Sequence, residues 1–348
     1  MRDNSPEISP QMPDTSVPPR DWLKTLARYR TPNHARSIFE LLTTAIPFVA
    51  LWAAAWFSLS VSYWLTLALA IPAAVFLVRF FMIQHDCGHG AFFNRKTIND
   101  WVGRAISVMT LTPYDIWRRD HAIHHGTSGN LTKRGTGDID TLTVKEYRAL
   151  PRWRRIAYHF YRHPLVLFGV GPAYLFLLQN RLPRGLMKAD WRYWTSAMGT
   201  NAAIIVAITA LIYAVGAGPF LLVHLPITLL AASIGVWLFY VQHQFEDTFW
   251  ANEQEWKLHD ASLYGSSHYD LPRPLRWLTA NIGVHHVHHF YSRIPFYRLQ
   301  QVLRDHPELV DVRRLTLKES FACTKLRLWD EGKRKLVTFT EARNQTSP

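Results

Sequence analysis

Residues 41–78 read LLTTAIPFVALWAAAWFSLSVSYWLTLALAIPAAVFLV and contain no charged side chain. A second charge-free stretch covers residues 193–245. As helices, the two stretches would extend about 57 Å and about 80 Å, because an α-helix rises 1.5 Å per residue. The hydrocarbon core of a membrane is roughly 30 Å thick, so each stretch is long enough to cross it twice.

Each charge-free stretch also has a natural break. The first breaks at residues 58–63, and the second at 216–219, where Gly-Ala-Gly-Pro interrupts a helical pattern. We therefore predict two transmembrane hairpins, about 38–59 with 63–84 and about 195–216 with 220–243. A large soluble helical core is the alternative, but helices in soluble proteins usually run for only about 8–20 residues.

The charges outside these stretches predict the orientation. The 348 residues include 39 Lys and Arg against 26 Asp and Glu, a net charge of +13. The basic residues gather before the first hairpin and between the hairpins, and the two hairpin turns carry none. The positive-inside rule then places both termini and the connection 85–192 in the cytoplasm. This charge suits anionic lipid headgroups, and nucleic acid is not expected because the charges flank membrane spans.

The fold class predicted from this pattern is an all-α integral membrane protein with a helical cytoplasmic cap. We expect five parts: a cytoplasmic tail (1–36), a transmembrane hairpin (37–86), a cytoplasmic connection (87–194), a second hairpin (195–244) and a C-terminal cap (245–348). Within the connection, the apolar residues 164–180 are too short and too broken for a span, and we expect an interfacial or re-entrant segment.

Nine of the seventeen histidines fall into three clusters. The clusters are His85-Asp86-Cys87-Gly88-His89, His121-Ala122-Ile123-His124-His125 and His285-His286-Val287-His288-His289. Residues three and four apart share one face of a helix, so each cluster can present two or three imidazoles together. His286 is off that face. His243 follows the last predicted span at the same membrane depth as the clusters.

This pattern predicts a metal site. Eight or nine nitrogen ligands exceed the four that one zinc ion takes, so two ions with four or five ligands each fit better. Imidazole suits iron, copper, zinc and nickel, and the His-Glu-x-x-His motif of zinc hydrolases is absent from the sequence. We therefore expect a redox pair of irons that activates O2. Asp86, Asp120 and Asn281 are candidates to orient ligand rings by hydrogen bonds.

The three clusters resemble the histidine boxes of the membrane fatty acid desaturase family. Residues 85–93 are similar to the first box, residues 121–125 to the second and residues 281–289 to the third, and the likeness extends over about residues 40–325. Residues 125–130 and 292–295 also look like the bacterial acyl-lipid branch, near its Δ12 (omega-6) and Δ5 types.

The resemblance implies a non-haem di-iron enzyme that uses O2 and two external electrons to place a cis double bond in a fatty acyl chain. The ligands it implies are His85, His89, His121, His124, His125, His243, His285, His288 and His289. The substrate would be an acyl lipid or an acyl thioester in a bacterial inner membrane. The sequence lacks the His-Pro-Gly-Gly motif of members with a fused haem donor, so a separate, ferredoxin-like donor is implied.

Two other functions remain open. The same type of centre serves hydroxylases and ketolases of lipids, so oxygen insertion is the alternative within enzymes. The alternative of another class is a non-enzymatic membrane protein that binds haem or metal. Haem carriers pair histidines within spans and transporters place ligands near the midplane, whereas these histidines lie at the ends of spans.

Overall fold

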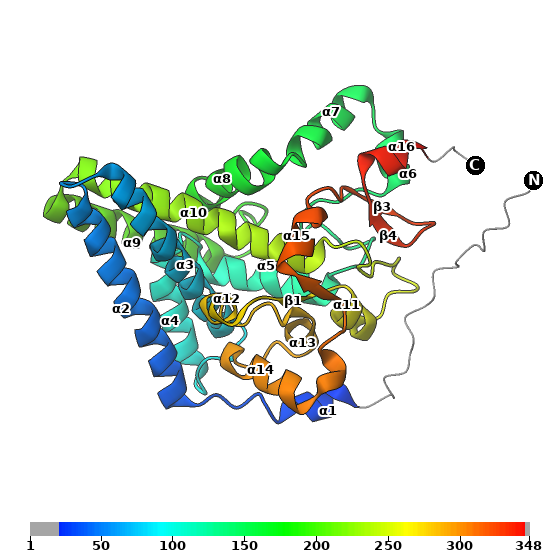
Figure 1. Ribbon diagram of the computed structural model, residues 1–348, viewed down its shortest axis with the longest axis horizontal. Helices are drawn as coiled ribbons and strands as arrows, with labels where there is room; N and C mark the ends of the chain where they lie inside the picture. Colours follow the sequence, from blue (N-terminus) through cyan, green and yellow to red (C-terminus); the bar gives the residue numbers. More distant parts are fainter. Residues whose placement is uncertain (1–20, 345–348) are drawn as a thin grey trace, which may run out of the picture.

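The computed structural model describes residues 21–344. Residues 1–20, which belong to the predicted N-terminal tail, and residues 345–348 lie outside the described part. Figure 1 shows a helical bundle at one end of the molecule and a cap of short helices and strands at the other. The prediction of a mostly helical membrane protein is confirmed, since four helices are long and apolar enough to cross a membrane.

The four candidate spans form two hairpins, as predicted: α2 (His34–Ser58) with α3 (Tyr63–Gly88), and α9 (Trp191–Val215) with α10 (Ala217–His243). At 1.5 Å per residue, 25 to 27 residues extend about 40 Å, so each exceeds the hydrocarbon core. The second turn is tighter than predicted, because the helix is interrupted at Gly216 alone, which has φ +89°.

The spans differ in how much protein covers them. Only 6% of the most apolar window of α9 is buried and 22% of that of α2, against 56% for α3. Thus α2 and α9 present most of their surface outward, where lipid would cover the apolar side chains. Helix α3 packs between α2 and α10 and forms the centre of the bundle.

The connection between the hairpins contains two longer helices and several short ones. Helices α4 (Lys96–Met109) and α5 (Tyr114–Thr127) pack on α3 and on α9. They are followed by α6 (Val144–Ala149), α7 (Arg152–Tyr161), the π-helix η1 (Val166–Val170), α8 (Gly171–Leu177) and the 3₁₀ turn η2 (Gln179–Arg181). In Figure 1, α7 and α8 run along the edge of the molecule. Leu165, Val170 and Leu178 are exposed there, which suits the predicted interfacial segment.

The C-terminal cap is helical with two small sheets. Its helices are α11 (Leu258–Tyr264), α12 (Arg273–Leu278), α13 (His285–Phe290), α14 (Phe296–Asp305), η3 (Pro307–Leu309), α15 (Leu317–Cys323) and α16 (Phe339–Asn344). Strand β1 (His268–Asp270) pairs in parallel with β2 (Arg314–Thr316), and β3 (Leu328–Asp330) pairs antiparallel with β4 (Lys335–Val337). These three-residue strands depart from a purely α-helical fold.

Buried polar contacts fasten the cap to the bundle. Arg79 of α3 is fully buried, forms an ion pair with Glu40 of α2 and donates to the carbonyl of Trp277 in α12. On the other side, the Tyr240 hydroxyl of α10 donates to the carbonyls of Cys323 (2.9 Å) and Leu326 (3.0 Å). The N-terminal helix α1 (Trp22–Ala27) packs against His306 through Trp22. These contacts hold the ends of α3 and α10 against the cap, where the histidine clusters lie.

Candidate metal centre

The first cluster lies at the end of a predicted span. Helix α3 continues through Gly88, so His85 and His89 lie one helical turn apart, with ring centroids 4.7 Å from each other. Gly88 lets α5 approach this turn, because a Cβ there would lie 2.7 Å from a ring carbon of Trp117. The close approach places the first cluster against the second.

The second cluster occupies the last two turns of α5. His121 and His125 are four residues apart, and their Nε2 atoms are 3.1 Å from each other. His124 lies one residue aside and points to the end of α10, where its Nε2 is 3.1 Å from that of His243. The second cluster therefore reaches in two directions from one helix.

The third cluster is α13, a helix of six residues. Gly283 precedes it and lies so close to β1 that a Cβ would be 2.2 Å from the carbonyl oxygen of Tyr269. His285 and His288 then face the other clusters: Nε2 of His285 is 3.0 Å from that of His243, and Nε2 of His288 is 3.2 Å from that of His125. The ring of His289 stacks on that of His125 at 4.1 Å.

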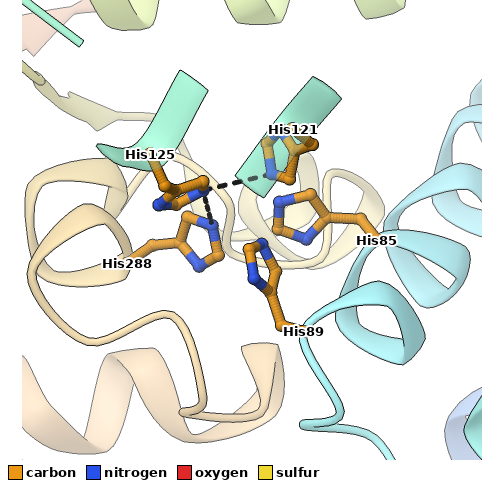
Figure 2. A group of neighbouring side chains, drawn as sticks. All are labelled: His85, His89, His121, His125 and His288. Atoms are coloured by element: carbon orange, nitrogen blue, oxygen red, sulfur yellow. Dashed lines mark hydrogen bonds between the residues drawn. The ribbon is translucent and has the colours of Figure 1, made fainter. Parts of the chain in front are cut away.

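The nine predicted ligands come together in two adjoining groups. One group contains His85, His89, His121, His125 and His288, which point toward one another in Figure 2. The other contains His124, His243 and His289, and His285 joins it through His243. The possible ligand atoms of the five-histidine group all lie within 4.8 Å of one another, and so do those of His124, His243 and His289. The arrangement gives five imidazoles on one side and four on the other.

These residues fit a pair of transition-metal ions. Two nitrogens bound to one ion at about 2.0–2.1 Å lie roughly 3 Å apart, which is the spacing of the four Nε2 pairs. Nε2 of His89 and of His289 is buried without a hydrogen-bond partner among the described residues, and a bound metal ion would supply the missing partner. Burial, followed by the neighbouring histidines, holds the pKa of the following rings well below the ordinary range and keeps them neutral: His121, His125, His285, His288 and His289.

A carboxylate that the sequence did not single out orients one of the rings. Nδ1 of His124 donates to Asp138 at 2.6 Å, which leaves its Nε2 directed at His243. Asp138 also accepts from the backbone N–H of Gly135 at 3.1 Å, so a glycine-rich turn fixes its position. The spacing gives no signal for this contact, since Asp138 follows His124 by 14 residues on a loop. The only hint is the turn Gly135-Thr136-Gly137, which brings the chain back to α5.

The three predicted ring-orienting residues behave differently. Asp86 lies 3.4 Å from Nδ1 of His85 and accepts from the backbone N–H of Phe296 at 2.7 Å. Asp120 and Asn281 contact other groups, and neither has a hydrogen bond to a ligand ring among the described residues. Asp120 pairs with Arg119 at 2.7 Å. It does not share the helical face of His121, because consecutive residues lie about 100° apart around a helix. The amide of Asn281 donates to the carbonyl of Phe296 at 3.3 Å from a left-handed turn, φ +53°.

His286 lies apart from both groups. Its Nε2 donates to the carbonyl of Leu309 at 2.9 Å, and its ring faces His268 at 5.5 Å. This position agrees with its place on the other face of α13. His286 therefore packs the third cluster against the cap.

A large cavity reaches the histidines from the bundle. Its volume is about 510 Å³, in the range of small-molecule binding sites, and His85, His121 and His285 form part of its wall. Most of the wall is apolar and comes from α3, α5 and α10: Leu77, Phe81, Ile116, Trp117, Ala232 and Phe239. Gln179 and Asn180 of η2 also contribute. The cavity can hold an apolar chain with part of its length beside the histidines.

Comparisons with known proteins show the family to which the chain belongs. Residues 62–320 match the model of a family described as fatty acid desaturase. A fatty acid desaturase of Bacillus subtilis is 46% identical over 316 residues, which cover 91% of this chain and 89% of the relative. An sn-1 oleoyl-lipid 12-desaturase of Anabaena variabilis is 26% identical over 84% of this chain and 83% of the relative. An sn-1 acyl-lipid omega-3 desaturase (ferredoxin) of Synechocystis sp. is 29% identical over 64% and 61%.

Proposed function

Because the chain belongs to the fatty acid desaturase family, we propose that it is an O2-dependent di-iron oxidoreductase that introduces a cis double bond into the acyl chain of a membrane lipid. The observation that carries this proposal is the meeting of nine histidines in two adjoining groups, three of which, His85, His121 and His285, line one largely apolar cavity. The reaction removes two hydrogens from the acyl chain. With two electrons and two protons from outside, O2 leaves as two molecules of water.

Iron is the metal that this reaction needs. The all-imidazole donor set would also accept zinc, but zinc has no redox chemistry. One ion would be held by His85, His89, His121, His125 and His288, and the other by His124, His243, His285 and His289. When bound, the two irons supply the oxidising power for hydrogen removal from an unactivated methylene group.

The cavity residues bind and orient the acyl chain. The apolar wall exchanges the water around the chain for protein, which is favourable at about 25 cal/mol per Å² of apolar surface. His85, His121 and His285 lie in the wall, so they fix which methylene groups rest beside the ions. The same wall excludes bulk water, which protects a strong oxidant from side reactions.

We infer the class of substrate and the position of the double bond from the names of the relatives. Several are sn-1 oleoyl-lipid 12-desaturases, so we assign this chain to acyl-lipid substrates and the Δ12 (omega-6) type, with an acyl thioester as the other class to test. The name of one relative includes ferredoxin, in line with a separate ferredoxin-like donor. The basic connection between the hairpins supports a bacterial inner membrane, with the termini and the site in the cytoplasm. The five-part division of the chain stays a prediction.

Product analysis tests the function. The full chain is expressed in a bacterium of known lipid content, and total fatty acid methyl esters are analysed by mass spectrometry. His121→Ala removes a proposed ligand, and His286→Ala is the matched control from outside both groups. We expect a new unsaturated acid with the wild type and with His286→Ala and none with His121→Ala. A hydroxylated product would replace desaturation by oxygen insertion, and an unsaturated product that persists in His121→Ala would refute the metal site.

A further inference from the structure

A second cavity adjoins the acyl cavity. Its volume is about 460 Å³, and its wall consists of helix α7, the loop 134–142 and Leu150. We call it the loop cavity. The two cavities share three wall residues: Gly135, Ile139 and Asp140. They therefore lie side by side, the acyl cavity against the histidines and the loop cavity against α7.

Helix α7 turns different faces to the loop cavity and to the exterior. Four residues with helical spacing line the cavity: Arg154, Ala157, Tyr158 and Tyr161. Three large apolar residues form a neighbouring face and are each 60–70% exposed: Trp153, Ile156 and Phe160. The segment that follows, with η1 and α8, packs on the span α10 and exposes Leu165 and Val170. A basic amphipathic helix in this position suits the headgroup layer of a membrane.

The wall of the loop cavity offers hydrogen-bond donors that the protein does not use. Nη2 of Arg134 pairs with Glu146, whereas Nη1 of Arg134 is buried without a partner among the described residues. Arg154 lines the same wall and forms no ion pair within the described part of the chain. The Tyr161 hydroxyl accepts from the backbone N–H of Asp140 at 3.1 Å, so its own proton can still be donated. Burial raises the pKa of Tyr161 to about 12, which keeps that proton in place.

The surroundings of the loop cavity are basic. Residues 144–163 contain six Lys and Arg and one Glu. The wall itself contains one carboxylate, Asp140, which repels an anion, and the guanidinium groups of Arg134 and Arg154, which attract one. Arginine suits a phosphate group because its planar fork can donate to two oxygens at once. The wall therefore fits a phosphate, next to a cavity that fits an apolar chain.

We propose that the loop cavity binds the headgroup phosphate of the glycerophospholipid whose acyl chain enters the acyl cavity. This inference rests on the proposed function and narrows its substrate to lipids that carry a phosphate diester. Arg134 and Arg154 hold phosphate oxygens, and Tyr161 donates its hydroxyl proton to another. A fixed phosphate limits how far the acyl chain reaches, and so which methylene groups rest beside the histidines.

Two lipids, one with a phosphate and one without, test the site. The full chain in a neutral maltoside detergent is titrated with dioleoyl phosphatidylglycerol or with dioleoylglycerol, and native mass spectrometry gives the two dissociation constants. Arg134→Gln with Arg154→Gln should weaken binding of phosphatidylglycerol at least about tenfold, because both charged contacts are lost. Binding of dioleoylglycerol should change by less than about twofold, since it makes neither contact.

A matched control removes the same charge from the same helix. Arg152→Gln with Arg155→Gln lies outside the cavity wall and should bind phosphatidylglycerol within about twofold of the wild type. Arg154→Gln alone keeps the ion pair of Arg134 with Glu146, so the fold is preserved, and it should weaken binding at least about threefold. Equal binding by the wild type and the Arg134/Arg154 variant would overturn the inference. Equal losses in the two double variants would also overturn it, because general attraction of charge would then explain the binding.

Two further probes identify the source of the phosphate. Millimolar inorganic phosphate should not displace phosphatidylglycerol, since it has no acyl chain for the neighbouring cavity. Displacement would assign the site to a free anion and overturn the lipid assignment. Oleoyl coenzyme A should bind less tightly than phosphatidylglycerol, and tighter binding would assign the site to a thioester carrier instead.

The binding measurements need no turnover, so they separate this site from the proposed function. If binding depends on the phosphate and no unsaturated product forms from the bound lipid, desaturation is refuted and the phosphate site stands. If unsaturated product forms and the two lipids bind alike in every variant, the phosphate site is refuted and desaturation stands.

Discussion

Replacing Asp138 should weaken the hold on one metal ion and spare the other. The carboxylate accepts from Nδ1 of His124 at 2.6 Å, and the His124 side chain is only 1% exposed. The hydrogen bond fixes which ring nitrogen faces His243. Asp138→Asn keeps the size of the side chain and removes its charge, so it tests the electrostatic support of this one ring.

The size of the effect follows from the contact. A hydrogen bond to a charged group contributes about 1.5–3 kcal/mol, and 1.4 kcal/mol is a factor of ten in affinity, so we expect about ten- to hundredfold weaker binding of that ion. Removing partners of this kind typically costs as much in other metal proteins. The assay is iron per chain by inductively coupled plasma mass spectrometry, after dialysis against increasing chelator. Asp138→Asn should reach one iron per chain at a chelator concentration at which the wild type keeps two.

Asp140→Asn is the matched control, because Asp140 lies on the same loop and makes no contact with a ligand ring among the described residues. It should lose iron as the wild type does. If Asp138→Asn and wild type release iron at the same chelator concentration, the carboxylate does not support the ion. If both ions leave together, the division of the ligands into two groups is wrong.

Three further predictions concern the cavity, the buried ion pair and pH. Gly235 lines the cavity, and a Cβ there meets no described atom within 4 Å. Gly235→Leu should therefore fill space for the acyl chain and lower desaturation at least about tenfold, with unchanged iron per chain. An equal amount of product would place the acyl chain elsewhere. Glu40→Gln leaves Arg79 buried without its charged partner and should lower the free energy of unfolding by about 3–5 kcal/mol, seen as a lower Tm in detergent. The double variant Glu40→Gln with Arg79→Met should recover most of the lost stability. An unchanged Tm in Glu40→Gln would contradict the buried ion pair. Burial lowers the pKa of His268, so the folded protein keeps the ring neutral below pH 6.5, where the unfolded chain takes up a proton. The stability that the neutral ring contributes is complete above pH 6.5 and is lost as the pH falls. The Tm difference between wild type and His268→Gln should therefore narrow from pH 8 to pH 5, and a constant difference would refute the assignment.

The spans and the histidine clusters could be predicted from the sequence because each depends on residues that are close together in the chain. A charge-free stretch of 38 or 53 residues has few alternatives to a membrane hairpin, and histidines three and four apart must share a helical face. His243 gave a weaker signal, since a single histidine has no spacing. Its depth at the end of a span was the information that placed it with the clusters.

The tertiary contacts of the site were not within reach. Asp120 is next to His121 in the chain and yet turns to Arg119, while Asp138 reaches His124 from a loop 14 residues away. Consecutive residues of a helix point in different directions. Contacts between residues far apart in the chain depend on the path of the loops, which residue spacing does not predict. The same reason hides the two small sheets, because strands of three residues are too short to show an alternating pattern.

Anomalous X-ray scattering at the iron absorption edge, from crystals of the full chain purified with its metal, tests the two-ion centre most directly. Two iron peaks should appear, one surrounded by His85, His89, His121, His125 and His288 and the other by His124, His243, His285 and His289. A single peak, or a signal at the zinc edge in place of the iron edge, would contradict the di-iron centre on which the proposed reaction depends.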